Sequence, residues 1–98
     1  MKSKLLNLIV SVKPEEEMNH YEIYGELGKG AYGVVRMGLD KRINNKIAIK
    51  IYEKKKLDEP NKIKNLEREI NILAELSHDT IAKIIDVIET QTELYLIL

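Results

Sequence analysis

The chain has 98 residues, enough for one small domain with a modest hydrophobic core. Lysine and arginine together number 16, as do aspartate and glutamate, so the charge balance argues for neither a nucleic acid nor a membrane surface as partner. The absence of cysteine excludes disulfides, thiolate metal sites and cysteine nucleophiles, and it fits the expectation of a cytoplasmic protein.

The first 20 residues are predicted to be an extension or linker that precedes the domain. The apolar segment 5–12 is far shorter than the roughly 20 residues that a membrane helix needs, and no cleavage pattern of small residues follows it. A signal peptide is therefore the less favoured interpretation, and a short helix or strand that packs on the domain or frays is the favoured one. Pro14 and the three glutamates after it predict a solvated linker.

After this extension, short strand-like segments alternate with turns. Strands are predicted over 21–27, 34–39 and 46–52, because apolar residues alternate along the first and β-branched residues enrich the third. Residues 28–33 form a glycine-rich turn between the first two. The links are too short to contain crossover helices, so the three strands are predicted to pair antiparallel.

A change in hydrophobic period then indicates a helix. Its apolar residues recur every three or four positions: Ile63, Leu66, Ile70, Leu73 and Leu76. The acidic, proline-containing segment 58–60 suits a helix start, and residues 77–80 are expected to end the helix. Two more strands are predicted over 81–89 and 93–98. The predicted fold class is therefore α+β, with a five-stranded antiparallel sheet and one main helix.

The glycine-rich turn contains Gly28, Gly30 and Gly33 in a Gly-x-Gly-x-x-Gly pattern. Such a loop lets backbone N–H groups approach phosphate closely, because glycine has no Cβ. The pattern alone is equally consistent with an ordinary hairpin. A strand rather than a helix follows, unlike in a dinucleotide-binding fingerprint, and Val34 and Val35 stand where a Walker A loop needs Lys-Ser/Thr. A loop between antiparallel strands that folds over a nucleotide is the interpretation left.

Lys50 lies inside an apolar strand, where an unpaired ammonium is unfavourable. Strand alternation places it on one face with Ala48 and Tyr52, and the small Ala48 leaves space there for a flat ring. Taken alone, Lys50 is better explained as an edge-strand lysine that reaches solvent. Glu69 lies beside the apolar stripe of the helix, one turn before Leu73, so it can face the sheet and pair with Lys50. Taken alone, Glu69 is better explained as a solvated helix glutamate.

Together these segments resemble the protein kinase catalytic domain, over roughly residues 21–98. The glycine loop spans 27–35, and the Val-Ala-Ile-Lys element of the family appears as residues 47–50 with Ile in place of Val. The helical segment 68–73 looks like helix C of the family, whose glutamate pairs with the strand lysine; here that glutamate is Glu69. The fold that this resemblance implies is the N-terminal lobe of the kinase domain.

Two further segments extend the resemblance. Residues 76–84 resemble the connection from helix C to the fourth strand, and residues 93–98 resemble the fifth strand. Segments 51–56 and 86–90 are similar to those of serine/threonine kinases, particularly the calcium/calmodulin-dependent group. The resemblance thus implies ATP-dependent phosphorylation of protein hydroxyls by a full-length parent.

The resemblance also implies which residues bind ATP. They are Leu27, Gly28, Lys29, Gly30, Ala31, Tyr32, Gly33, Val34, Val35, Ala48, Lys50 and Leu98. The loop amides would cover the phosphates, and Lys50 would hold the α- and β-phosphates. Leu27, Val35 and Ala48 would sandwich the adenine, and Leu98, at the gatekeeper position, would close the back of the pocket. A hydrophobic stack that couples helix to sheet would include Leu73 and Ile84.

The sequence departs from the family pattern in lacking the His-Arg-Asp, Asp-Phe-Gly and Ala-Pro-Glu motifs. His78 belongs to the helix exit, and His20 is expected to be solvated. We therefore expect no catalytic base and no metal ligand in these 98 residues, and no activity of this chain by itself. Mg²⁺ and the protein substrate would be held by the missing second lobe of a full-length parent. A fragment is the favoured interpretation, with a non-catalytic module that binds nucleotide or a partner as the alternative.

Overall fold

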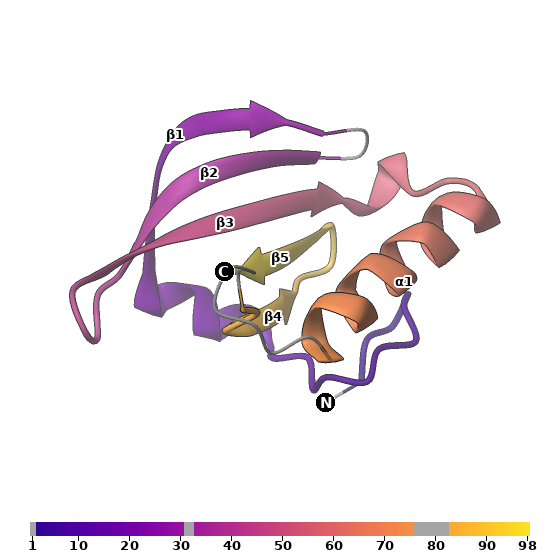
Figure 1. The fold of residues 1–98 in the computed structure, drawn as a ribbon, viewed down its shortest axis with the longest axis horizontal. Helices are drawn as coiled ribbons and strands as arrows, with labels where there is room; N and C mark the ends of the chain where they lie inside the picture. Colours follow the sequence, from indigo (N-terminus) through magenta and orange to yellow (C-terminus); the bar gives the residue numbers. More distant parts are fainter. Residues whose placement is uncertain (1, 31–32, 76–82) are drawn as a thin grey trace.

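A computed structural model of the chain describes residues 2–30, 33–75 and 83–98. It contains one five-stranded sheet with a single long helix beside it, and the N-terminal segment passes below both (Figure 1). The 3-10 helices (η), strands and helix are, in chain order, η1 (Glu15–His20), β1 (Tyr21–Lys29), β2 (Gly33–Asp40), β3 (Asn45–Glu53), η2 (Lys54–Lys56), α1 (Pro60–Glu75), β4 (Asp86–Glu89) and β5 (Glu93–Ile97).

The strands lie in the order β1-β2-β3-β5-β4, and every neighbouring pair is antiparallel. Short links join β1 to β2, β2 to β3 and β4 to β5, whereas β3 and β5 are neighbours although α1 separates them in the sequence. The three long strands lie above the short β5 and β4 in Figure 1, and α1 lies at the side of the short strands. The predicted α+β class, with five antiparallel strands and one main helix, is confirmed.

The fourth strand is shorter than the sequence predicted. A strand was expected over 81–89, whereas β4 spans Asp86–Glu89 and residues 83–85 are not in a strand. β4 lies at the edge of the sheet with β5 as its neighbour, and β5 ends at Ile97. Apolar residues upstream cannot extend β4, because a strand needs main-chain partners on its neighbour. The expected helix end falls within residues 76–82, outside the described part of the chain.

Helix α1 begins where the sequence predicted. Pro60 is its first residue, a position where the missing N–H is not needed. The Asp58 carboxylate accepts a hydrogen bond from the Lys62 ammonium at 2.8 Å, one turn later. Leu66 and Ile70 are fully buried, and the remaining described members of the apolar stripe, Ile63 and Leu73, pack against the same core.

An apolar cluster covers each face of the sheet. The cluster on the α1 side consists of Leu6, Val12, Tyr52, Leu57, Leu66, Ile70, Val87, Leu94 and Leu96. The cluster on the other side consists of Tyr21, Ile47, Ile49, Ile88 and Ile97. Successive residues of β4 and β5 alternate between the two clusters, as the pleat of a strand requires. Burial of apolar surface on both faces therefore fixes the register of these strands.

Residues 3–13 are built into the fold. Leu6 and Val12 are only 4% and 1% exposed and belong to the cluster on the α1 side. The Lys13 N–H donates to Val87 O at 2.8 Å, and the Lys13 carbonyl accepts from Glu89 N–H at 3.0 Å, which adds a parallel bridge along β4. Of the interpretations that the sequence left open for this segment, packing on the domain is the one that the structure shows.

The segment after Pro14, which was predicted to be a solvated linker, forms the 3-10 helix η1. Proline restricts the residue before it rather than those after it, and the Glu17 N–H donates to Pro14 O at 3.1 Å to start the helix. Met18 packs against the apolar cluster opposite α1. His20, which was expected to be solvated, keeps a partly exposed side chain whose Nε2 lies 3.2 Å from the Glu17 carboxylate.

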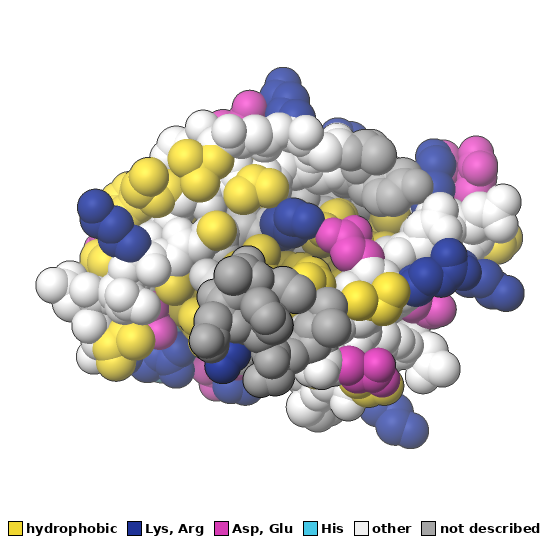
Figure 2. Space-filling model, viewed as in Figure 1, with side chains coloured by type: hydrophobic (Ala, Val, Ile, Leu, Met, Phe, Trp, Pro, Cys, Tyr) yellow, Lys and Arg dark blue, Asp and Glu magenta, His cyan; other side chains and the backbone are white. Residues whose placement is uncertain are grey.

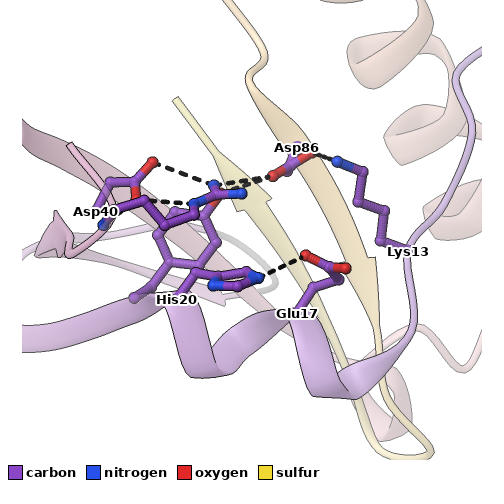
Figure 3. A network of polar contacts seen from close by, with 7 residues as sticks. Lys13, Glu17, His20, Asp40 and Asp86 are labelled. Carbon is purple, nitrogen blue, oxygen red and sulfur yellow. Dashed lines mark hydrogen bonds and ion pairs between the residues drawn. The ribbon is translucent and has the colours of Figure 1, made fainter.

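A polar network around the buried Asp86 joins Lys13, β1, β4 and the turn after β2. The Asp86 carboxylate, 7% exposed, accepts from the Tyr21 hydroxyl at 2.6 Å and pairs with the Lys13 ammonium at 2.6 Å. Arg42 donates to the Tyr21 hydroxyl at 2.9 Å and to Asp40. Figure 3 shows Lys13 and Asp86 pointing toward each other, with Asp40 on the far side of the network. Burial, and then the hydrogen bond to Asp86, raise the pKa of Tyr21 well above its usual range.

Candidate functional site

The glycine loop joins the ends of β1 and β2. Cross-strand pairing sets Gly28 opposite Val35 and Lys29 opposite Val34, after two shifts of register between Ile23 and Gly28. The Gly30 N–H donates to Gly33 O at 2.8 Å, which closes the loop and uses that amide within the chain. Ala31 and Tyr32, which the sequence analysis placed in the site, lie outside the described residues.

Two glycines of the loop, Gly28 and Gly33, differ in whether the surrounding structure requires glycine. A Cβ at Gly33 would lie 2.0 Å from the carbonyl oxygen of Ile51, so glycine is required there for β2 to approach β3. A Cβ at Gly28 would meet nothing within 4 Å among the described residues, and the backbone there is not left-handed. Neither packing nor backbone conformation therefore explains the glycine at 28, and open space above the strand is what close approach by a ligand requires.

Strand β3 carries Lys50 to the centre of the sheet. Lys50 lies opposite Val35 of β2 on one side and opposite Leu96 of β5 on the other. Its Nζ donates a hydrogen bond to Glu69 Oε1 of α1 at 2.9 Å. The pairing that the sequence analysis expected between a strand lysine and a helix glutamate is therefore present.

Tyr52 is a member of this site that the sequence analysis did not assign. Its side chain is buried on the same face as Lys50, two residues along β3, and its hydroxyl donates to Glu69 Oε1 at 3.4 Å. The available signal was strand alternation, which had already placed Tyr52 on the face of Lys50. Burial, and then the Glu69 charge, raise the pKa of Tyr52, so its hydroxyl stays protonated as a donor.

These residues line a small groove of about 150 Å³. Its lining consists of Gly30, Gly33, Val34, Val35, Lys50, Tyr52 and Glu69. Figure 2 shows hydrophobic side chains gathered over the strands on the face turned to the viewer, with charged side chains between those strands and α1. The groove thus combines two glycines of the loop, an apolar strand surface and one ammonium held in place.

The other expected site residues lie in β1, in β3 and just after β5, and they do not line this groove in the described part of the chain. Leu27 is 59% exposed near the end of β1. Ala48 and Leu98 are paired through their backbones, with Leu98 N–H donating to Ala48 O at 2.9 Å. Leu98, Leu73 and Ile84 all pack against the apolar cluster on the α1 side, so the expected link from helix to sheet through Leu73 and Ile84 is present.

The electrostatics of the groove favour a charged lysine. Partial burial disfavours the Lys50 ammonium, but the hydrogen bond to Glu69 and the nearby Tyr52 hydroxyl outweigh it and hold the pKa of Lys50 above its usual value. Across residues 2–30, 33–75 and 83–98, no three acidic or histidine side chains gather as metal ligands. No helix of the described chain has the length and apolar character needed to cross a bilayer.

Comparison with known proteins agrees with this geometry. The family model described as the protein kinase domain matches residues 21–98. The probable serine/threonine-protein kinase MARK-A of Dictyostelium discoideum is 39% identical over 90 residues, which cover 91% of this chain and 8% of that protein. The probable serine/threonine-protein kinase fhkC of the same organism is 43% identical over 79 residues, covering 80% of this chain and 13% of that protein.

Calcium-dependent protein kinase 5 of Plasmodium falciparum is 39% identical over 98 residues, covering 99% of this chain and 17% of that protein. The chain thus spans less than a fifth of the length of each of these relatives. The family match covers β1 to β5, including the glycine loop, Lys50 and Glu69. The chain belongs to the protein kinase domain family, and its fold is that of the N-terminal lobe.

Proposed function

We propose that this chain is the ATP-binding lobe of a protein serine/threonine kinase. The observation that carries the proposal is the Lys50–Glu69 pair, which holds an ammonium in the groove beside the glycine loop. The relatives named MARK-A and fhkC are described as probable serine/threonine-protein kinases, which supports the class of acceptor hydroxyl. The parent activity would be transfer of the ATP γ-phosphoryl group to serine or threonine in a protein.

In this proposal the residues of the lobe bind and orient the nucleotide. The open backbone at Gly28 allows phosphate to approach, and Lys50 interacts with the α- and β-phosphates. Glu69 acts through Lys50, because its carboxylate fixes the direction of the ammonium. Leu27, Val35, Ala48 and Leu98 form the apolar wall for the adenine.

Mg²⁺, when bound, would neutralise charge on the β- and γ-phosphates, and its ligands are expected outside these 98 residues. The same holds for the aspartate that would orient the acceptor hydroxyl, since no His-Arg-Asp motif occurs in the sequence. The contribution of this lobe is therefore positioning and electrostatic stabilisation. Removing one fixed donor to a group on which charge develops typically lowers the rate about 10²–10³-fold.

The test is a titration of the ¹⁵N-labelled chain with Mg²⁺–ATP, followed by amide chemical shifts. We expect weak binding, with the largest changes at Gly28, Gly30 and Lys50. The Lys50→Met variant should lose most of these changes. The matched control is Lys46→Met, because Lys46 lies in the same strand and is exposed. Shift changes elsewhere only, or equal changes in Lys50→Met and Lys46→Met, would contradict the proposal.

A further inference from the structure

Residues 3–13, here called the N-terminal strap, are fastened to β4 near both ends. Near the start, the Lys4 N–H donates to the Glu89 carboxylate at 3.1 Å, and Leu6 is buried. Near the end, Val12 is buried and Lys13 exchanges backbone hydrogen bonds with β4. Figure 1 shows this indigo segment passing along the lower side of α1 before it reaches the region below β4.

The middle of the strap is hydrogen-bonded to α1. The Asn7 N–H donates to Glu67 Oε1 at 3.0 Å. The Asn71 side chain donates from Nδ2 to the Asn7 carbonyl at 3.1 Å and accepts at Oδ1 from the Ile9 N–H at 2.9 Å. One amide side chain therefore satisfies a backbone acceptor and a backbone donor of the strap, as a neighbouring strand would do.

The strap and the sheet contact opposite sides of α1. Successive residues of an α-helix are about 100° apart, so Glu67 and Asn71, each two positions from Glu69, project about 200° away from it. Glu69 faces Lys50 of β3, whereas Glu67 and Asn71 face the strap. The buried Leu66 and Ile70 lie between these two flanks. A rotation of α1 that withdrew Glu69 from Lys50 would therefore also break the contacts with the strap.

We propose that the outer flank of α1 is an intramolecular docking surface for the strap, and that the docked strap holds α1 in the rotation at which Glu69 reaches Lys50. Asn71 is the positioning residue of this surface, because its amide both donates to and accepts from the backbone of the strap. Any effect of the docked strap on nucleotide binding rests on the proposed function. The coupling between the strap and the Lys50–Glu69 pair does not.

The coupling can be measured without nucleotide. Lys50 acylation by acetic anhydride, read by mass spectrometry relative to the exposed Lys46, reports how firmly Glu69 holds the ammonium. Hydrogen exchange of the α1 amides reports how firmly the helix is held. Asn71→Ala removes two hydrogen bonds of the middle attachment while leaving the Glu67 contact and the buried Leu6 and Val12 in place. Asn65→Ala is the matched control, because Asn65 is an exposed asparagine of the same helix.

We expect Asn71→Ala to raise the relative acylation of Lys50 roughly 2- to 10-fold, the range that loss of a hydrogen bond gives, and to speed exchange of the α1 amides. Asn71→Asp keeps the acceptor for Ile9 N–H and loses the donor to Asn7 O, so its effect should be intermediate. Glu69→Gln sets the upper limit of the acylation signal, and Asn65→Ala should match the unchanged chain.

Lys50 acylation in Asn71→Ala that equals that in Asn65→Ala overturns the proposal, even where α1 exchanges faster. No rise in acylation in Glu69→Gln would also overturn it, since the pair to be positioned would then be absent in solution. Failure of the chain to bind ATP alters neither measurement. The docking surface and the nucleotide site are thus tested separately.

Discussion

The Lys50 ammonium and the Glu69 carboxylate meet at 2.9 Å while both remain substantially exposed, at 32% and 41% of their side-chain surface. Ion pairs exposed to this degree contribute only about 0–1 kcal/mol to folding. The stability of the lobe comes instead from the apolar clusters on the two faces of the sheet. The pair is therefore better explained by the position that it gives to the ammonium than by the stability that it adds.

Replacing Lys50 with Met in a longer protein that contains this lobe and supports turnover should abolish phosphoryl transfer without loss of the fold. Met keeps most of the apolar stem of lysine but removes the fixed cation, so we expect a rate loss of about 10²–10³-fold. Glu69→Gln should cost less, because the ammonium remains but is less well held. Steady-state kinetics together with thermal melting of each variant check this order, and Glu75→Gln, on the exposed end of α1, is the control. Equal turnover of Lys50→Met and the unchanged protein would remove the functional interpretation of Lys50.

Two glycines of the loop should respond oppositely to alanine. At Gly33 the added methyl group meets the Ile51 carbonyl, so Gly33→Ala should destabilise the chain by about 1–3 kcal/mol, the usual cost of overpacking. At Gly28 the methyl group meets open space, so the free energy of unfolding should change by less than about 0.5 kcal/mol. Gly28→Ala should nevertheless weaken the ATP-induced shifts. Urea unfolding and the ATP titration, run on both variants, separate the two effects, and an unstable Gly28→Ala would show that the loop packs more closely than the structure indicates.

Stability should depend on pH through Glu89. Burial opposes ionisation of this carboxyl group, but the Lys54 ammonium at 2.8 Å and the Lys4 amide outweigh burial and hold the pKa of Glu89 below its usual value. A lowered pKa in the folded state gives stability that is present above the unfolded pKa, about 4.3, and is lost as the pH falls through the folded pKa. Glu89→Gln should therefore destabilise the chain by roughly 1–3 kcal/mol at pH 7 and by much less at pH 3. Urea unfolding at both pH values measures the difference, with Glu16→Gln at an exposed position as control. If Glu89→Gln lowers the free energy of unfolding equally at pH 7 and pH 3, the loss comes from altered packing and not from the lost charge.

Most of the sheet and the helix could be predicted because their signals are local. Alternation in β3 correctly placed Ile47 and Ile49 on one face and Lys50 and Tyr52 on the other. The three- and four-residue period of α1 correctly indicated its buried stripe. The Lys50–Glu69 contact joins two elements 19 residues apart, and it was expected because each side chain lies on the face that its own periodicity turns toward the other element.

Other features could not be predicted, because their partners are distant in sequence and leave no local pattern. Asn7 and Asn71 are polar residues in segments where polarity indicates only exposure, yet they bond to each other across 64 positions. The first residue of β4 depends on where β5 stops, because Asp86 pairs with Ile97. The apolar residues before β4 give no indication of that limit. The charges after Pro14 indicated solvation correctly for Glu15 and Glu16, but not that the backbone forms η1.

The N-terminal strap should contribute to the stability of the lobe although the kinase family match begins at residue 21. Leu6 is 4% exposed within the main apolar cluster, whereas Ile9, three residues later, is 60% exposed. Leu6→Ala should therefore destabilise the chain by about 2–5 kcal/mol, through lost burial and the cavity left behind. Ile9→Ala removes a side chain of the same size from the same segment and should change the free energy of unfolding by less than about 0.5 kcal/mol. Urea unfolding followed by circular dichroism compares the two variants directly. Similar values for both would mean that the strap is not docked in solution, whereas a large difference would show that residues before the matched kinase domain complete its core.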